Sequence, residues 1–206
     1  MWTEADFATE TNVSRETLTA FSTWNDILKT WNKRINLVAP GEIDSFWHRH
    51  AFDSWQLTTY LPPTWNRIVD LGSGGGFPGI ALGIFAKQRG QGEVHLVESI
   101  GKKATFLKTV SRNLSLPVQV HGERVEALDP LEADVITARA FAPLPRLLAY
   151  ATPHLKPGGV LILPKGEKAE AEIAEARTDW IFDVESFKSL TSDSATILRL
   201  SGLERK

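Results

Sequence analysis

The fold is decided by residues 67–79, which read Arg-Ile-Val-Asp-Leu-Gly-Ser-Gly-Gly-Gly-Phe-Pro-Gly. An apolar run ends in Asp70, four glycines follow between Gly72 and Gly76, and Pro78 favours the start of a helix. Glycine lets backbone N–H groups come close to a ligand, and the N-terminus of a helix is electropositive. A strand, a carboxylate, a glycine turn and a helix start therefore predict a site for a nucleotide-like cofactor.

The order Asp-x-Gly-x-Gly-x-Gly in this stretch is the form seen in S-adenosylmethionine (SAM) methyltransferases. Gly74-x-Gly76-x-x-Gly79 also matches the dinucleotide-binding fingerprint, which is a weak signal as a bare pattern. That match begins late, four residues beyond Asp70, and its third glycine lies inside the expected helix start. A purely structural glycine turn is a third interpretation. We favour SAM.

The composition describes one ordinary globular domain: 206 residues, 42% hydrophobic and 23% charged. The lack of cysteine excludes a disulfide scaffold and a cysteine nucleophile, and it suits a reducing cytoplasm. No apolar run reaches membrane-spanning length, and acidic residues stand where a signal peptide carries basic ones, so we expect a cytoplasmic protein without a membrane anchor. The net charge of −2 means that any RNA binding must use a local basic face.

The first sixty residues predict helices. Residues 14–37 have apolar positions spaced by three or four and Ser14 as a cap, Pro40-Gly41 breaks this helix, and a second helix covers 42–60. We expect residues 1–62 to form an N-terminal helical extension packed on a SAM-binding domain, 63–206. Five tryptophans lie in the extension, and their helical spacing favours packing over stacking on RNA bases: Trp2, Trp24, Trp31, Trp47 and Trp55.

From residue 67 onward, strand and helix patterns alternate. Strands are expected at 67–71, 93–98, 117–121, 134–138 and 159–163, and helices at 78–88, 101–114, 124–128, 144–154 and 166–176. Such alternation predicts a doubly wound α/β fold with a parallel sheet. Residues 180–190 and 195–203 read as a closing antiparallel hairpin, so the whole resembles the seven-stranded, Rossmann-like class I SAM methyltransferase fold.

Ligands of doubly wound sheets lie outside the carboxyl ends of the strands, where four residues draw interest. Asp70 either holds the amides of the turn or meets the cofactor's ammonium group. Glu98 is placed to accept both ribose hydroxyls of an adenosine, unless it is simply an exposed acid. Glu126 lies near the expected adenine position, or is an acid favoured at a helix start. Arg139 needs an anionic partner: a cofactor carboxylate, an RNA phosphate, or an ion pair such as Asp134.

Basic residues indicate a possible RNA face. Lys102 and Lys103 open an expected helix, where the helix dipole disfavours cations, so an external anion is indicated. Others that join them around the cleft, unless they form a merely solvated surface, are Lys33, Arg34, Arg49 and Lys165. His48 and His50 lack companions at ligand spacing, and no metal site is expected.

Two missing features narrow the chemistry. The strand expected at 134–138 is not followed by Asn/Asp-Pro-Pro-Tyr/Phe, which grips exocyclic amines, and there is no cysteine for the covalent route to pyrimidine C5. Guanine N7 fits, because its lone pair is nucleophilic and carries no proton, so no general base is required. Transfer then depends on in-line positioning, and Arg139 is expected to position rather than to accept a proton.

Several segments together resemble the bacterial small-subunit ribosomal RNA guanine-N7 methyltransferases, the glucose-inhibited division protein B family (RsmG). The resemblance covers nearly the whole chain and is most specific in Gly-Phe-Pro-Gly at 76–79 and in Arg-His-Ala-Phe-Asp-Ser at 49–54. The other segments are 31–37, Trp-Asn-Lys-Arg-Ile-Asn-Leu; 102–107, Lys-Lys-Ala-Thr-Phe-Leu; 139–142, Arg-Ala-Phe-Ala; and 164–166, Pro-Lys-Gly.

The resemblance implies SAM-dependent methylation of a guanine N7 in 16S rRNA, in the loop near the decoding site, by a cytoplasmic enzyme. With the residues argued above, the expected cofactor set is Asp70, Gly72, Gly74, Gly76, Phe77, Glu98, Val125, Glu126 and Arg139. The expected RNA-binding set is Lys33, Asn36, Arg49, His50, Lys102, Lys103 and Lys165. Glu98 stands where the family commonly has Asp, and Val125 where Ala is frequent; both changes preserve the type of contact.

Two other functions remain open from the sequence. One is a SAM methyltransferase that acts on a small molecule or a protein. The other is an RNA-binding ribosome-assembly factor with a vestigial SAM site, against which the intact glycine loop argues. The substrate is naked rRNA, the small ribosomal subunit or an assembly intermediate, and a monomer is the default expectation.

Overall fold

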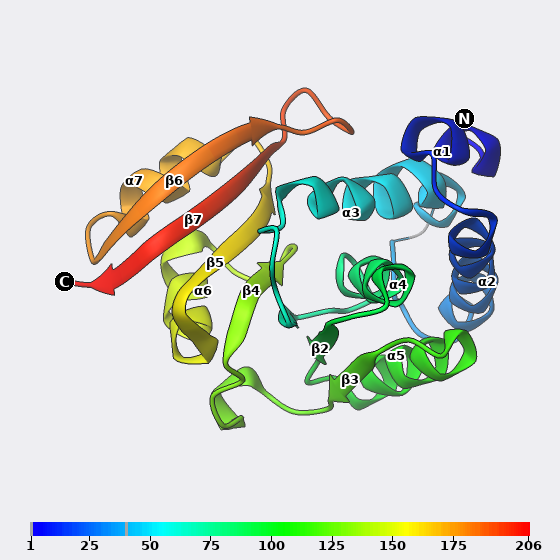
Figure 1. Ribbon diagram of the computed structural model, residues 1–206, viewed down its shortest axis with the longest axis horizontal. Helices are drawn as coiled ribbons and strands as arrows, with labels where there is room; N and C mark the ends of the chain where they lie inside the picture. Colours follow the sequence, from blue (N-terminus) through cyan, green and yellow to red (C-terminus); the bar gives the residue numbers. More distant parts are fainter. Residues whose placement is uncertain (1, 40) are drawn as a thin grey trace.

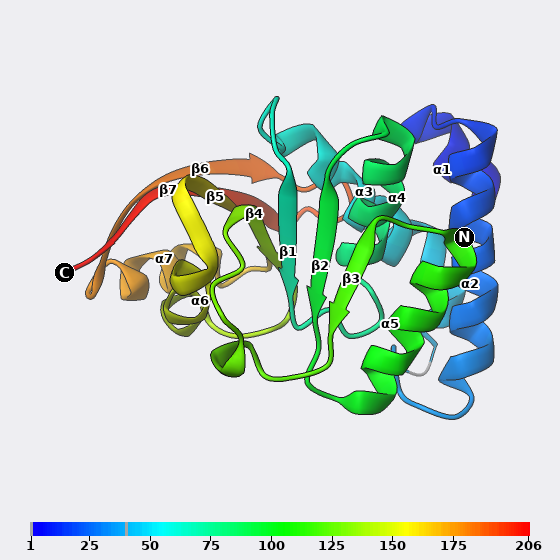
Figure 2. The same cartoon turned by 60° about the horizontal axis from the view of Figure 1, so that its bottom comes forward.

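The strand order of the sheet is β3-β2-β1-β4-β5-β7-β6 in the computed structural model, which describes residues 2–39 and 41–206 (Figures 1 and 2). The parallel strands are β1 (Arg67–Leu71), β2 (Glu93–Val97), β3 (Val118–His121), β4 (Ala133–Ala138) and β5 (Leu155–Lys165). β6 (Trp180–Lys188) and β7 (Thr196–Arg205) form an antiparallel hairpin, whose β7 pairs with β5. The predicted doubly wound fold with an antiparallel end is confirmed, and its order reverses between β1 and β4, where such folds bind ligands.

Helices cover both faces of the sheet. α4 (Gly79–Arg89) and α5 (Gly101–Leu114) lie on the same face as the N-terminal helices, while α6 (Leu144–Ala151) and α7 (Ala169–Ala176) lie on the other (Figure 2). Alternate strand residues supply the two cores: Ile68 packs with the first group and Val69 with the second. Within the described part of the chain, no helix combines the length and the apolar character needed to cross a membrane.

Four predicted elements differ in extent from the structure. The helix expected at 124–128 is a single 3-10 turn, Val125–Ala127, and α7 begins at Ala169 instead of residue 166. The helix expected at 144–154 closes in a 3-10 turn at Thr152–His154, where Pro153 has no N–H to continue the α-helical ladder. β5 starts earlier than expected, at Leu155, and its pairing with β4 shifts register between Ala133 and Val135.

The N-terminal helices are α1 (Glu4–Thr11), for which no helix was expected, and α2 (Arg15–Asn32). Ser14 caps α2 by accepting a hydrogen bond from Thr17 N, as expected. α2 ends before residue 37 because the Asn32 side chain accepts hydrogen bonds from the backbone N–H groups that follow, those of residues 37 and 38. Gly41 has a left-handed φ of 84°, and Pro40 of the expected break lies outside the described residues.

The helix expected at 42–60 consists of segments with different hydrogen-bonding patterns. A 3-10 turn at Ile43–Ser45 leads into a π-helical segment at Phe46–Phe52, followed by α3 (Asp53–Trp55) and a 3-10 turn at Gln56–Tyr60. π-Helical turns are rare and often mark functional sites. The segment that resembles the family at residues 49–54 lies across this unusual geometry.

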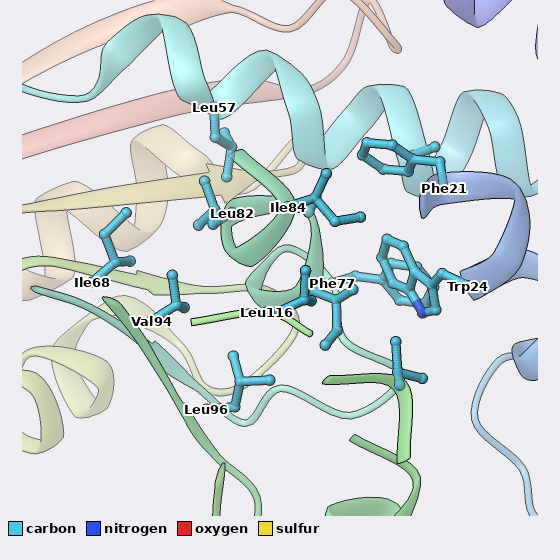
Figure 3. Close-up of a cluster of buried hydrophobic side chains, with 14 of the residues drawn as sticks. Phe21, Trp24, Leu57, Ile68, Phe77, Leu82, Ile84, Val94, Leu96 and Leu116 are labelled. Carbon is cyan, nitrogen blue, oxygen red and sulfur yellow. The ribbon is translucent and has the colours of Figure 1, made fainter. Parts of the chain in front are cut away.

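The extension and the sheet share one core (Figure 3). Trp24 is fully buried, and its ring centroid lies 4.9 Å from that of Phe77 in the glycine turn. The other four tryptophans of the extension also pack on apolar rings: Trp2 on Phe52, Trp31 on Phe106, Trp47 on Phe7 and Trp55 on Phe85. Packing therefore accounts for these residues, and the boundary at residues 62 and 63 stays a prediction.

Replacing Trp24 with alanine should lower the free energy of unfolding by about 3–5 kcal/mol, because it leaves a large cavity between α2 and the glycine turn. Urea denaturation measures the change. Trp2→Ala, at a partly buried tryptophan on the edge of the same hydrophobic core, is the matched control and should cost clearly less. Equal losses for the two variants would contradict this description of the core.

Candidate cofactor and substrate site

The buried carboxylate of Asp70 organises the turn between β1 and α4. Asp70 Oδ2 accepts a hydrogen bond from Gly79 N at 3.2 Å, and Oδ1 accepts one from Thr137 Oγ1 at 3.0 Å. The side chain thereby caps α4, which has no cap of its own, and ties β1 to β4. Burial raises the pKa of Asp70 to about 7, against the opposing effect of these hydrogen bonds. Because Asp70 is fully buried, the geometry favours its interpretation as a residue that holds the turn.

Glycine is required in the turn by backbone conformation and by space. Gly72 has a φ of 70°, and a Cβ there would lie 2.4 Å from the Phe141 ring. Gly76 has a φ of 93°, and a Cβ there would lie 2.5 Å from Ile80 Cγ1. The backbone N–H of Gly72 donates to Val97 O, which anchors the turn on the end of β2. Both glycines hold the chain in a shape that other residues rarely adopt.

Glu98 lies directly beyond β2 and binds the turn from the other side. Its Oε2 accepts a hydrogen bond from Gly74 N at 2.9 Å, and its Oε1 accepts one from Ile100 N at 2.8 Å. Glu98 is only 6% exposed, so it is not the exposed acid of the alternative interpretation. A carboxylate oxygen has a second lone pair, and both oxygens can therefore accept further hydrogen bonds from ribose hydroxyls.

A cavity of about 360 Å³ opens at the carboxyl ends of β1, β2 and β4. Four residues of the expected cofactor set line it: Gly72, Glu98, Val125 and Glu126. An acid for the ribose, the apolar Val125 for the adenine and the close approach of the chain at Gly72 fit SAM. The lining does not include Asp70, Gly74, Gly76, Phe77 or Arg139. The Phe77 ring is buried under the turn, stacked 4.3 Å from the His50 ring.

A second, larger cavity of about 700 Å³ adjoins the first, and Ala140 lines both. Its walls come from three parts of the chain: Arg49 and Asp53 from the extension, Arg139 and Lys165 from the ends of β4 and β5, and Thr191 from the loop between β6 and β7. Three cations and five hydroxyl-bearing residues lie in this lining, together with the carboxylates of Glu42 and Asp53, which pair with Arg49 and Arg139. The cavity is therefore suited to a polar, anionic ligand next to the cofactor position.

Arg139 is held by the extension and does not pair with Asp134. Its Nη1 donates to Asp53 Oδ2 at 3.1 Å and to the carbonyl oxygen of Arg49 at 3.0 Å. Asp134, proposed from the sequence as a possible partner, lies at the opposite end of the sheet. There it accepts hydrogen bonds from the backbone N–H groups of residues 66 and 67 and pairs with Lys156. Sequence reasoning missed Asp53, although it belongs to the segment at 49–54.

His50 corrects an expectation about RNA contacts. The residue borders the large cavity but is only 3% exposed, and its Nδ1 lies 3.1 Å from Arg139 Nη2, so little of the side chain is open to a contact with RNA. Burial, followed by the nearby charges of Arg139 and Arg49, lowers the pKa of His50 to about 3. The imidazole is thus neutral near pH 7, and its Nδ1 accepts a hydrogen bond from the guanidinium.

The remaining RNA candidates form two groups. Arg49 is exposed at the large cavity, and Lys165 also faces it, but the Lys165 side chain is 11% exposed and its ammonium group is bound to Glu172 at 2.8 Å. The second group lies around the C-terminal end of α2 and the N-terminal end of α5: Lys33, Asn36 and Lys102 are exposed and Lys103 is half-buried. Between them, Trp31, Arg34 and Lys102 line a depression of about 380 Å³.

The sheet order, the closing hairpin and the cavity at the switch point define a class I SAM-dependent methyltransferase fold. Solved structures agree: a SAM-dependent methyltransferase from Aquifex aeolicus has a TM-score of 0.58 at 13% identity, covering 86% of this chain and 97% of that one. TYW2 from M. jannaschii in complex with AdoMet has a TM-score of 0.55 at 15% identity, covering 84% and 80%.

The family follows from sequence. Residues 17–198 match the family GidB, rRNA small subunit methyltransferase G. Ribosomal RNA small subunit methyltransferase G from Rhodospirillum centenum is 45% identical over 95% of this chain and 89% of its own length. The protein of the same name from Cereibacter sphaeroides is 46% identical over 93% and 94%. The chain belongs to this family, and the resemblance stated from its motifs is confirmed.

Glu98→Gln should weaken SAM binding by about tenfold, because an amide offers one acceptor oxygen where the carboxylate offers two and charge-assisted hydrogen bonds are the stronger ones. Isothermal titration calorimetry measures the dissociation constant. Glu93→Gln changes the same residue type at the opposite end of β2, where Glu93 pairs with Arg67, and should leave the affinity unchanged. An unaffected affinity in Glu98→Gln would remove this residue from the cofactor site.

Proposed function

We propose that the protein transfers a methyl group from SAM to N7 of a guanine in 16S rRNA, in the loop near the decoding site. Two adjoining cavities that share Ala140 carry this proposal: one fits the cofactor, and the other offers cations beside the transfer point. Family membership over nearly the whole chain supports the substrate class, since the relatives are named for small-subunit rRNA. The protein would act as a monomer in the cytoplasm, where it meets the rRNA, the small subunit or an assembly intermediate.

The side chains around the transfer point suit a reaction that needs no general base. Asp53 forms an ion pair with Arg139. His50 is buried, and burial lowers its pKa to about 3, so its imidazole is neutral near pH 7. SAM, when bound, would supply the methyl group as a sulfonium, whose positive charge the guanine ring would take up as the S–CH3 bond breaks and the N7–CH3 bond forms. Guanine N7 has no proton to lose, so the residues have only to align donor and acceptor.

We assign the expected cofactor residues to two roles, contact with the cofactor and support of the turn. Gly72, Glu98, Val125 and Glu126 contact the cofactor from the cavity wall, while Asp70, Gly74, Gly76 and Phe77 shape the turn behind it. Arg139 is proposed to bind an anionic group of either ligand at the point where the two cavities meet.

Mass spectrometry of nucleosides from mapped 16S rRNA fragments tests the function directly. Cells without the gene should lack one 7-methylguanosine near the decoding site, and a plasmid copy should restore it. An unchanged modification pattern would contradict the proposal. The alternative of a protein or small-molecule substrate predicts methyl incorporation by the purified protein that ribonuclease treatment of the acceptor does not abolish.

The exposed cations between α2 and α5 are proposed to bind RNA phosphates. Lys102→Glu combined with Lys103→Glu should weaken rRNA binding and reduce the slope of log affinity against log salt by about 1 to 2, because each phosphate contact contributes roughly 0.7 to 0.9. Filter binding over a salt series measures both effects. Arg205→Glu with Lys206→Glu reverses the same number of positive charges at the far end of β7 and should change the slope little. Identical slopes for the two double variants would exclude this face.

A further inference from the structure

Asp53 joins the three walls of the large cavity. Its Oδ2 accepts a hydrogen bond from Arg139 Nη1 at 3.1 Å, and its Oδ1 accepts one from Thr191 Oγ1 at 2.5 Å. Gln56, one helical turn further on, donates to the same Oδ1 at 3.0 Å and accepts from Leu190 N at 2.9 Å. One carboxylate thus connects the extension, the end of β4 and the loop between β6 and β7.

The π-helical segment brings three acceptors to one guanidinium. Asp53 follows this segment directly, and the Arg49 carbonyl oxygen and His50 Nδ1 inside it also lie at hydrogen-bond distance from Arg139. The Phe77 ring lies beneath, with its centroid 5.0 Å from the guanidinium carbon. With so many fixed partners, the Arg139 side chain has little freedom to move, although a quarter of it, 24%, stays exposed to the cavity.

We propose that Asp53 is a positioning residue for methyl transfer, which acts through Arg139 and through the loop at 189–191. This inference rests on the proposed role of the two cavities. Charge-assisted hydrogen bonds to Arg139 set the orientation of its planar fork, and the bond to Thr191 sets the position of the facing wall. A small misplacement of such groups slows the reaction strongly, since a shift of about 1 Å can reduce a rate by about a hundredfold.

A merely structural ion pair would behave differently. Asp53 lies in the cavity lining with 17% of its side chain exposed, and its partners are side chains at the end of β4, in the 3-10 turn at Gln56–Tyr60 and in the loop between β6 and β7. Its loss should therefore affect the alignment of Arg139 and the loop more than the stability of the fold. Asp134 is the matched comparison: it too is a carboxylate bound to a cation and to backbone N–H groups, but at the far end of the sheet.

The test is a double-mutant cycle with Asp53→Asn and Arg139→Ala, measured as kcat and KM for methyl transfer to 16S rRNA. Asp53→Asn should lower kcat/KM by about 10- to 100-fold, and Asp53→Glu should restore part of the loss. In the Arg139→Ala background, Asp53→Asn should add less than about threefold. Asp134→Asn should reduce the urea midpoint at least as much while leaving kcat/KM within about threefold of the unchanged protein.

The inference would be overturned if Asp53→Asn lowered kcat/KM by the same factor with and without Arg139. It would also be overturned if the loss of kcat/KM only matched the loss of stability, measured as the urea midpoint and compared with Asp134→Asn. Should Asp53→Asn fail to fold, Thr191→Val tests the link to the loop: KM for rRNA should rise about three- to tenfold with unchanged cofactor affinity, and an unchanged KM would overturn it. If the wild-type protein did not methylate rRNA, the proposed function itself would be refuted. Failure of the inference about Asp53 is therefore distinguishable from failure of the proposed function.

Discussion

The hydrogen bonds of Asp70 are the interaction on which the site depends. One buried carboxylate closes the N-terminus of α4 through Gly79 and binds Thr137 of β4, so the turn, the helix and the switch point of the sheet are fixed together. Leaving either partner unpaired in the interior would cost about 1–3 kcal/mol. Glu98 repeats this arrangement on the other side of the turn by accepting from Gly74 and Ile100, and it does so at the cavity wall. Glu98 therefore lines the cavity proposed for the cofactor, while Asp70 holds the turn without lining that cavity.

The N-terminal extension is part of the site as well as of the core. Trp24 packs against Phe77 of the glycine turn, and the His50 ring is stacked on the same phenylalanine. The same segment supplies the acceptors for Arg139. The extension therefore supplies both the aromatic contacts that stabilise the turn and the polar network that orients Arg139. These contacts bring the family motifs at 49–54 and 76–79 together in space, although the two are far apart in the sequence.

Local sequence signals predicted the features that local physics determines. The glycine turn, the parallel strands, the Ser14 cap and the closing hairpin each depend on the conformational preferences of neighbouring residues. What the sequence did not reveal depends on contacts between distant segments. Arg139 and Asp53 are 86 positions apart, and nothing local distinguishes Asp53 from Asp134 as its partner. Likewise, the burial of His50 follows from Phe77 above it and Arg139 beside it, and the ion pair of Lys165 depends on Glu172 in α7.

A crystal structure of the protein with S-adenosylhomocysteine, the demethylated cofactor, is the most direct measurement of how the turn builds the site. We predict that both ribose hydroxyls lie within hydrogen-bond distance of the Glu98 carboxylate, that the adenine rests against Val125, and that the sulfur lies at Ala140, facing the cavity that Arg139 lines. Adenosine bound instead in the large cavity, or in the depression between α2 and α5, would contradict the placement of the cofactor at the Asp70 turn.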